Sequence, residues 1–406
     1  MIPLEEARAA VLDAVPPVSV RPVPIRRASG LVLAEAVVAR EAVPPFANSA
    51  MDGYAVRAAD TAGASMSGPV RLRVVGELPA GRAPTRSVAT GESIRIMTGA
   101  PVPDGADAIV MVERTEVDGD GVLVHQAALP GDHVRPAAGD LRAGQPVFEP
   151  GAVLGPAHVG VLASLGYAEV AAVPRARVGV LATGDELVEG DDPLSPGQIR
   201  DANRPMLLAL VEEAGCEARD LGIARDDEAL ILRTLEDAFE SCDAVITSGG
   251  VSVGDYDYVK AALDRFGALQ WWQVAIKPAK PFAFGVVQGV PVFGLPGNPV
   301  SAHVSFELFA RPALLQMMGR PSRFRPEIHA VAQHAMSRKP DGRLHLDRVR
   351  VGRQDGRYVA ARSGAQASNV LSGMAQANGL AFLPDGDGVP EGGDVSVMRL
   401  DWTADH

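Results

Sequence analysis

The sequence predicts a multidomain α/β plus β protein: a central Rossmann-like parallel α/β domain, an inserted small β-barrel domain, an N-terminal α+β domain and a C-terminal β domain. Strands and helices alternate between residues 177 and 260, as in parallel sheets covered by helices. Short strand-like runs between Gly, Pro and Asp turns fill residues 70–140 and return after residue 326. We therefore divide the chain into residues 1–45 with 141–175 (a discontinuous N-terminal domain), 46–140 (the insert), 176–326 (the α/β domain) and 327–406 (the C-terminal β-barrel).

The composition is that of a globular protein, and the net charge limits the ligands. Of 406 residues, 47% are hydrophobic and 22% charged, and the formal net charge is −12. This charge argues against non-specific binding to nucleic acid or anionic membranes, so we expect neither partner. The two cysteines, Cys216 and Cys242, exclude a disulfide framework and are expected to be buried thiols. No signal peptide or membrane span is visible, which favours the cytoplasm.

The N-terminal part predicts a helix at residues 4–15 and a strand at Leu31–Val38. Pro44–Pro45 then stop regular structure before a crowded polar loop that contains Asp52. This loop is either a plain linker between domains or a functional segment, and Asp52 is its candidate functional residue.

The insert predicts four short strands, at Arg71–Gly76, Ser93–Met97, Ala108–Glu113 and Gly121–Gln126. The Gly- and Pro-rich turn at Met97–Ala108 suits a fixed loop, in which Thr98 and Gly99 offer a hydroxyl and a backbone N–H to a ligand. A plain hairpin turn is the alternative. A strand at Gln145–Phe148 and a helix at Ala157–Leu165 then complete the N-terminal domain.

The α/β domain begins with the apolar strand Val178–Leu187, and its further elements are expected at Asn203–Ala214, Ala218–Ile223, Asp227–Phe239 and Ala244–Ile246. Polar turns follow three of its strands, and parallel strands place such turns at one edge of the sheet. Carboxylates therefore converge there. Helix capping alone explains Asp227 but not Glu186 or Asp257.

The stretch from Asp243 to Lys260 organises this domain as a buried strand, a glycine-rich turn and a helix start. The glycines allow a ligand to approach the main chain closely, and serine hydroxyls with free helix N–H groups suit a phosphate. Two carboxylates at the helix start suggest Mg²⁺, which prefers oxygen ligands. The alternative is a turn without a ligand. The candidate residues are Ser248, Gly249, Gly250, Ser252, Gly254, Asp255 and Asp257.

Lys277 and Lys280 flank Pro278 in a stiff segment, which holds two ammonium groups near each other. Paired cations in an acidic chain predict an oxyanion site, with an ordinary surface pair as the alternative. A long helix is expected to start near Pro299, a favoured position in a first turn, with Ser301 beside its free N–H groups. After Pro326, strands are expected at Leu344–Val351, Tyr358–Ala361, Leu380–Phe382 and Asp394–Met398.

These stretches together resemble the molybdopterin molybdenumtransferase family, which includes MoeA and the gephyrin E-domain. The similar motifs are PPFANSAMDGYAV, IMTGAPVPDGADAIV, LATGDEL, TSGGVSVGDYDYVK, IKPAKPFAFG and GLPGNPVSA, between Pro44 and Ala302. The resemblance implies a homodimer of four-domain subunits that inserts molybdenum from molybdate into adenylylated molybdopterin, with Mg²⁺-assisted release of AMP. It also implies molybdopterin adenylyltransferase and molybdoenzyme-maturation proteins as partners.

The resemblance assigns roles to individual residues. Glu186, Asp226 and Asp257 are the acidic residues around magnesium and the pterin phosphates, with Glu186 and Asp257 holding the ion. The Ser248–Gly254 loop is the phosphate cradle, and further substrate contacts are Thr183, Gly184, Asp185, Pro296, Pro299 and Ser301. Molybdate is held by Lys277, Lys280, Arg343 and Ser368. Residues that the partner subunit brings to the cleft are Asp52, Thr98 and Asp140. Ala279 stands where many relatives have glycine.

Two rival functions are weighed against this one. A molybdopterin adenylyltransferase-type enzyme shares the central domain but does not require the inserted and C-terminal β domains. A non-catalytic scaffold like gephyrin carries an extra domain and a long linker, and nothing in this sequence resembles them. Acidic and basic site residues together favour the enzyme.

Overall fold

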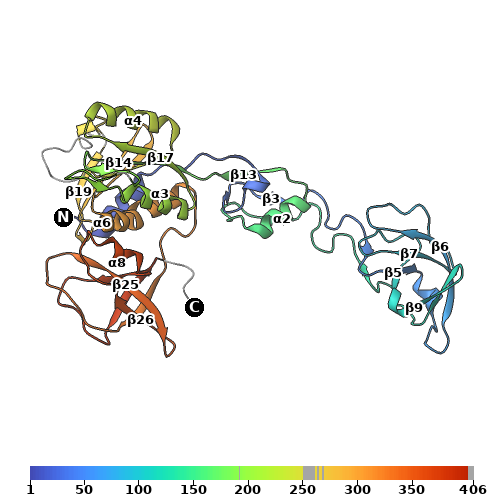
Figure 1. Ribbon diagram of the computed structural model, residues 1–406. Coiled ribbons are helices and arrows are strands. Elements are labelled where there is room, and N and C mark those ends of the chain that lie inside the picture. Colours follow the sequence, from blue (N-terminus) through green and yellow to red (C-terminus); the bar gives the residue numbers. More distant parts are fainter. Residues whose placement is uncertain (192, 250–260, 263–264, 268, 401–406) are drawn as a thin grey trace. The chain divides into compact units, whose positions relative to one another are not determined.

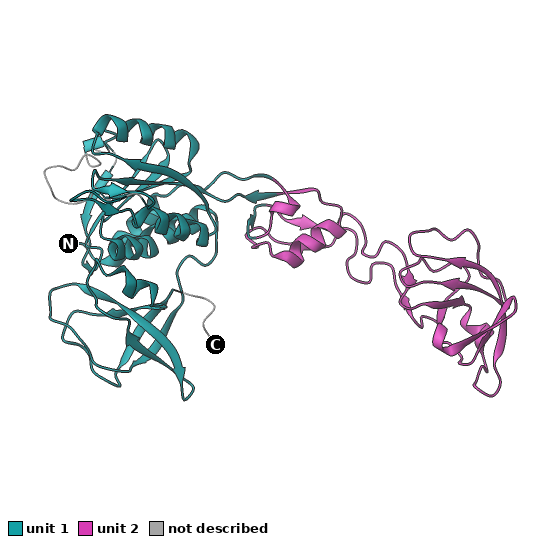
Figure 2. Cartoon of the chain, in the orientation of Figure 1, with its two compact units in different colours: residues 1–22, 30–34, 171–406 teal, residues 23–29, 35–170 magenta. Residues whose placement is uncertain are grey.

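The computed structural model describes residues 1–191, 193–249, 261–262, 265–267 and 269–400. The chain forms two compact units, coloured separately in Figure 2. The first unit contains residues 1–22, 30–34 and 171–406, and the second contains residues 23–29 and 35–170. Within the described ranges, no helix has the length and apolar character needed to cross a membrane.

The second unit contains a six-stranded sheet with the order β8-β5-β7-β6-β10-β9. Its strands are β5 (Gly53–Val56), β6 (Val70–Leu78), β7 (Glu92–Ile96), β8 (Ala108–Met111), β9 (Thr115–Asp118) and β10 (Gly121–Val124). Both faces of the sheet are covered, because alternate side chains point in opposite directions: Tyr54 and Val56 lie in one core and Ala55 in another. The other elements are η1 (Ile25–Arg27), β3 (Val37–Val38), β4 (Asn48–Ser49), η2 (Ala58–Thr61), η3 (Val112–Arg114), β11 (Val134–Arg135), β12 (Pro146–Phe148) and α2 (Pro156–Ser164).

The first unit is built on a six-stranded mixed sheet with the order β17-β14-β18-β22-β21-β19 (Figure 1). Four neighbouring strands are parallel: β14 (Arg177–Thr183), β17 (Glu217–Ala224), β18 (Ala244–Ser248) and β22 (Val290–Leu295). This is the predicted parallel α/β core. Two antiparallel strands, β21 (Pro281–Val287) and β19 (Leu269–Gln273), extend it on one side.

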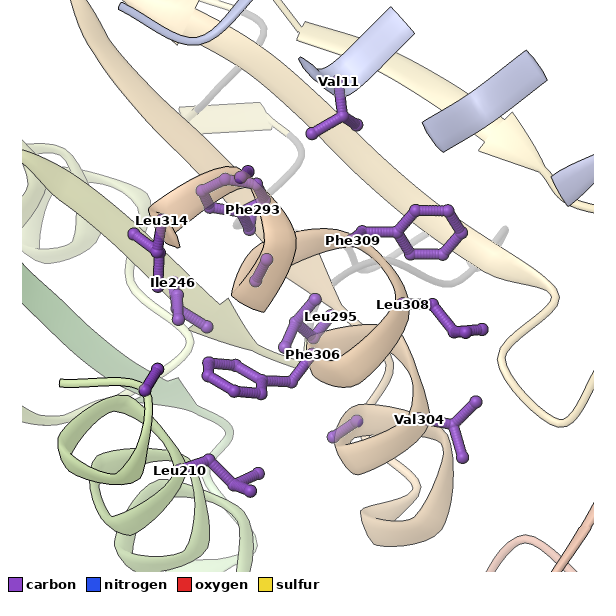
Figure 3. Close-up of a cluster of buried hydrophobic side chains, with 14 of the residues drawn as sticks. Val11, Leu210, Ile246, Phe293, Leu295, Val304, Phe306, Leu308, Phe309 and Leu314 are labelled. Atoms are coloured by element: carbon purple, nitrogen blue, oxygen red, sulfur yellow. The ribbon is translucent and has the colours of Figure 1, made fainter. Parts of the chain in front are cut away.

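Helices cover both faces of this sheet. One face packs against α1 (Leu4–Ala14), α3 (Asn203–Glu213) and a long helix formed by α6 (Pro299–Ser305), the π-helical turn η4 (Phe306–Ala310) and α7 (Arg311–Met317). Figure 3 shows part of this core, in which Phe306 and Phe309 of the helix belong to the same buried cluster as the strand residues Ile246 and Phe293. The other face packs against α4 (Glu228–Ser241) through Ile231 and other apolar side chains. Both cysteines are buried free thiols, as expected.

The C-terminal part closes into a five-stranded barrel in the order β25-β26-β23-β29-β27, because β27 also pairs with β25. Its strands are β23 (Glu327–Ala332), β25 (Leu344–Gln354), β26 (Arg357–Arg362), β27 (Gly379–Leu383) and β29 (Asp394–Arg399). The short strand β20 (Ile276–Lys277) pairs in parallel with the start of β25, which connects the barrel to the central sheet. The remaining elements are β1 (Arg21–Pro24), β2 (Val32–Leu33), β13 (Glu169–Val173), β15 (Leu187–Val188), β16 (Ile199–Arg200), β24 (Met336–Ser337), α8 (Leu371–Ala375) and β28 (Gly388–Val389).

The predicted fold class is confirmed, and one predicted strand is wrong. Leu31–Val38 is not one strand but two, β2 and β3, separated by Ala34–Ala36. The reason is that β2 pairs with β13 and β3 pairs with β12. The chain passes from one compact unit to the other within this segment.

Candidate functional site

The turns that follow β14 and β17 meet at the carboxyl edge of the central sheet. The backbone N–H of Gly184 donates to the carbonyl oxygen of Ala224 at 3.2 Å, and the N–H of Asp226 donates to Asp185 Oδ1 at 3.3 Å. Gly184 has φ +143°, a backbone conformation that favours glycine, and the Glu186 carboxylate lies beside it. This turn holds the predicted acidic residues 185 and 186 next to the turn that carries Asp226.

The end of β18 lies against the same turns. Gly249 has φ +96°, and an added Cβ would lie 2.9 Å from the carbonyl oxygen of Thr183. The Thr183 hydroxyl donates to the carbonyl oxygen of Ser248 at 3.5 Å. Convergence of the three strand ends is thus confirmed for the described residues. The other predicted members of the cradle, Gly250, Ser252, Gly254, Asp255 and Asp257, lie outside the described residues.

A cavity of about 1110 Å³ lies between the edge of the central sheet and the C-terminal barrel. Of the predicted site residues, Lys277, Lys280, Pro296, Ser301, Arg343 and Ser368 line it. Pro299 is not part of its lining, and it occupies the first turn of α6 as predicted. The structure therefore brings the whole predicted molybdate set into one cavity, although Lys277 and Ser368 are 91 positions apart in the sequence.

The cavity wall is strongly cationic, although the chain is acidic. Six Lys and Arg side chains line it against two Asp side chains. Within the part of the chain that the structure describes, the ammonium groups of Lys277 and Lys280 have no hydrogen-bond or ion-pair partner. Unpaired cations of this kind suit a tetrahedral dianion, which accepts charge-assisted hydrogen bonds.

Arg343, in contrast, is already paired. Its Nε donates to Asp341 Oδ2 at 3.1 Å, and its guanidinium Nη2 donates to the same oxygen. Arg338 and His345 also contact the Asp341 carboxylate, at 3.0 and 3.1 Å. The hydrogen bond from Arg343 is the main reason why the pKa of Asp341 lies far below its ordinary value. An anion that binds Arg343 must therefore share it with Asp341.

Two features of the barrel fix the cation positions. Arg343, His345 and Asp347 all line the cavity at alternate positions around the start of β25, since side chains in a strand alternate between faces. His345 lies directly opposite Lys277 in the β20–β25 ladder. Arg348, which is buried on the same strand, donates to the carbonyl oxygens of Ala365 and Ala367 and so fixes the loop that carries Ser368.

Sequence reasoning missed several residues of the wall: Arg338, Lys339, Asp341, His345, Asp347 and Arg362. The signal that was available is the charged run SRKPDGRLHLDR, which starts at Ser337. In addition, Ala279 has φ +74°, a conformation that favours glycine. It lies between the two lysines with its side chain buried in the core.

The residues predicted to come from a partner subunit all lie in the second unit. Both the backbone N–H and the hydroxyl of Thr98 donate to Asp52 Oδ1 at 2.7 Å, and these bonds lower the pKa of Asp52. The N–H of Gly99 donates to the carbonyl oxygen of Ser49. The Thr98 hydroxyl and the Gly99 N–H are thus engaged within the second unit, as in the plain-turn alternative, and their contact with a ligand stays a prediction. The N–H of Asp140 donates to the carbonyl oxygen of Val43 at 2.9 Å.

The described acidic residues have the oxygen donors that magnesium prefers. Glu186 and Asp185 are both exposed beside the turn that carries Asp226. Across the described ranges, no group of three or more His, Cys, Asp or Glu side chains is arranged to hold a metal ion. The donor chemistry fits Mg²⁺, and the second predicted magnesium ligand, Asp257, is not among the described residues.

A cation-lined cavity between the edge of an α/β sheet and a β-barrel suits an anionic ligand, and comparison with known proteins identifies the family. Three family models match: MoeA N-terminal region (domain I and II) at residues 2–166, probable molybdopterin binding domain at 179–316, and MoeA C-terminal region (domain IV) at 331–400.

Relatives cover nearly the whole chain. Molybdopterin molybdenumtransferase 2 of Mycobacterium tuberculosis is 44% identical over 89% of this chain and 90% of its own. Molybdopterin molybdenumtransferase of Haemophilus influenzae is 37% identical over 98% of both chains. A crystal structure of the molybdopterin biosynthesis MoeA protein from Pyrococcus horikosii has a TM-score of 0.81 and 32% identity, covering 99% of each chain. This chain therefore belongs to the molybdopterin molybdenumtransferase (MoeA) family, and the expectation that it is an enzyme is confirmed.

Proposed function

We propose that this enzyme inserts molybdenum from molybdate into adenylylated molybdopterin and releases AMP in a magnesium-dependent reaction. The observation that carries the proposal is the cationic cavity, where Lys277 and Lys280 have no partner among the described residues. Its volume of about 1110 Å³ far exceeds one tetrahedral oxyanion. Room therefore remains for the sulfur-bearing end of the pterin beside the bound oxyanion.

The chain's own groups bind and orient the molybdate substrate. The two lysines supply positive charge, and Arg343 supplies directed N–H donors from the barrel. Ser301 and Ser368 offer hydroxyls from α6 and the barrel loop. The backbone N–H of Val300 donates to the carbonyl oxygen of Ser368 at 3.2 Å, so these two serines are held at one place.

The turns at the carboxyl edge of the sheet are proposed to hold the phosphate end of the substrate. Thr183, Gly184, Ser248 and Gly249 provide a close-packed backbone surface there. Glu186 would hold Mg²⁺ together with Asp257, and Asp226 would lie beside the ion and the phosphates. When bound, the ion neutralises charge that develops as the phosphoanhydride breaks. The sheet fixes the ends of its strands, and the strand ends in turn hold these carboxylates in place for the ion.

A homodimer with a shared cleft is also proposed, because Asp52, Thr98 and Asp140 lie in the second unit but resemble cleft residues of the family. Mixing chains that carry Asp52→Ala with chains that carry Lys277→Ala should restore activity in heterodimers with one complete cleft. Inactivity of heterodimers whose formation has been demonstrated, for example by two affinity tags, would contradict the shared cleft.

The proposed oxyanion site is tested by equilibrium binding of molybdate to the purified protein. Lys277→Ala combined with Lys280→Ala should weaken binding more than a hundredfold, since each lost charge-assisted bond contributes about 1.5–3 kcal/mol. Arg350→Ala is the matched control, because Arg350 is exposed on the same strand as His345 and does not line the cavity. Equal weakening in both variants would show a general charge effect and contradict the site. A parallel incubation with ATP and molybdopterin tests the adenylyltransferase alternative.

A further inference from the structure

The side chain of Asn203 connects the proposed phosphate-binding turns at the end of β18 to the wall of the oxyanion cavity. Asn203 is the first residue of α3, and it does not line the cavity. Its Nδ2 donates one hydrogen bond to Ser248 Oγ at 2.8 Å and another to the carbonyl oxygen of Gly297 at 2.7 Å. Both N–H donors of a single amide are therefore used to join the ends of two neighbouring strands.

The two hydrogen bonds of Asn203 lie at the point where the backbone ladder between β18 and β22 ends. The parallel ladder between β18 and β22 ends at the pair Ser248 and Leu295, followed by one bond from the N–H of Gly249 to the carbonyl oxygen of Leu295. Beyond Leu295, the last residue of β22, the chain leaves the sheet through Pro296 and Gly297. Asn203 ties Gly297 to Ser248 just past the last ladder pair and so limits how far the two strand ends separate.

The segment held by Asn203 forms part of the cavity wall. Gly297 lies between Pro296 and Asn298, which both line the cavity, and Ser301 follows in the first turn of α6. The N–H of Val300 then reaches the loop that carries Ser368. A shift of Gly297 would therefore move groups on both the sheet side and the barrel side of the cavity.

Asn203 is itself held firmly. The next residue, Arg204, is only 4% exposed, and its guanidinium pairs with Glu189, Asp201 and Asp220. Its backbone N–H donates to Asp201 Oδ1 at 3.1 Å. Because this network fixes the start of α3, the Asn203 amide is positioned before any ligand binds. Preorganised supports of this kind are typical of groups that set the geometry of a site.

From these contacts, we infer that Asn203 is a positioning residue that sets the geometry of the oxyanion cavity by tying the Gly297 loop to the end of β18. This inference rests on the proposed function, because it assigns the cavity to an oxyanion. Both hydrogen bonds of the Asn203 amide are made to the chain itself, so the role inferred for it is indirect. A displacement of about 1 Å at a distant support can reduce the activity of a site about a hundredfold.

The test compares Asn203→Ala and Asn203→Asp with Asn378→Ala. The aspartate keeps the shape of the side chain but removes both N–H donors and places a carboxylate against the carbonyl oxygen of Gly297. Asn378 is the matched control, because it is also half-buried, its amide also takes part in two hydrogen bonds, both with the backbone of Val351, and it does not line the cavity. Molybdate affinity, melting temperature and hydrogen exchange of residues 294–302 are measured for each.

Both Asn203 variants should bind molybdate at least tenfold more weakly and exchange amide hydrogens faster in residues 294–302. Asn378→Ala should lose melting temperature while keeping wild-type affinity and wild-type exchange in this segment. Wild-type affinity or exchange in the Asn203 variants overturns the inference, as does an equal loss of affinity in Asn378→Ala. If the wild-type protein itself binds no molybdate, the proposed oxyanion site fails, and the hydrogen exchange alone decides whether Asn203 positions the loop.

Discussion

Replacing Arg343 with alanine tests the oxyanion cavity at its barrel wall. Arg343 lines the cavity with its side chain 24% exposed, and it is paired with Asp341. A hydrogen bond to a charged partner contributes about 1.5–3 kcal/mol, so its loss should weaken molybdate binding about ten- to a hundredfold. The variant also removes a partner of Asp341, and a carboxylate about 4 Å from an anion costs about 1 kcal/mol even with the screening of bulk water.

The assay is a titration of turnover against molybdate, beside a melting curve of the same variant. Arg343→Ala should raise the molybdate concentration needed for turnover while leaving the affinity for the pterin unchanged. Arg343→Lys should recover only part of the loss, because an ammonium group lacks the planar fork of donors. Adding Asp341→Asn to Arg343→Ala should recover the part that comes from the unpaired carboxylate. If Arg343→Ala lowers the melting temperature but leaves the molybdate dependence unchanged, Arg343 only braces the barrel and the reasoning is refuted.

Two further predictions concern stability and pH. Glu307→Gln should lower the free energy of unfolding by up to about 3–5 kcal/mol, because the buried Arg325 then keeps only the half-exposed Glu213 as its ion-pair partner. Glu217→Gln, in an exposed pair with Arg219, should cost less than about 1 kcal/mol; equal costs in denaturant titrations would contradict this. Thr98→Val should raise the pKa of Asp52 towards its ordinary value in a carboxyl NMR titration. Because the folded-state pKa of Asp52 is depressed, the stabilisation by the Asp52–Thr98 pair is present above the unfolded pKa and is lost as the pH falls through the folded pKa. An unchanged pKa in Thr98→Val would show that the Thr98 hydroxyl does not lower it.

Much of the site was predictable because its residues stand in motifs near strand ends. Lys277, Lys280 and Ser301 lie in short segments that follow or precede strands of the central sheet, and parallel strands bring their carboxyl ends to one edge. The Asp227 cap is confirmed, since its carboxylate accepts hydrogen bonds from Ala229 and Leu230. The roles of individual residues in binding remain predictions.

What the sequence could not show depends on pairing between distant strands. Periodicity identifies a strand but not its neighbour or register. The pairing of Lys277 with His345 joins residues that are far apart along the chain, so neither the His345 position nor the shared carboxylate Asp341 was foreseen. The antiparallel strands β21 and β19 were also missed, although the two-residue turn Gln288-Gly289, with positive φ at both residues, is a local sign of the β21–β22 hairpin.

The central claim is that this enzyme couples molybdate capture to AMP release, and it is tested most directly by one measurement. Purified protein is incubated with adenylylated molybdopterin and Mg²⁺, and AMP is followed as molybdate is titrated, with tungstate in parallel. We predict AMP release that saturates with molybdate and that requires much higher molybdate concentrations in the combined Lys277→Ala, Lys280→Ala variant. AMP release that is independent of molybdate and tungstate, or equal in the wild type and that variant, would contradict the account.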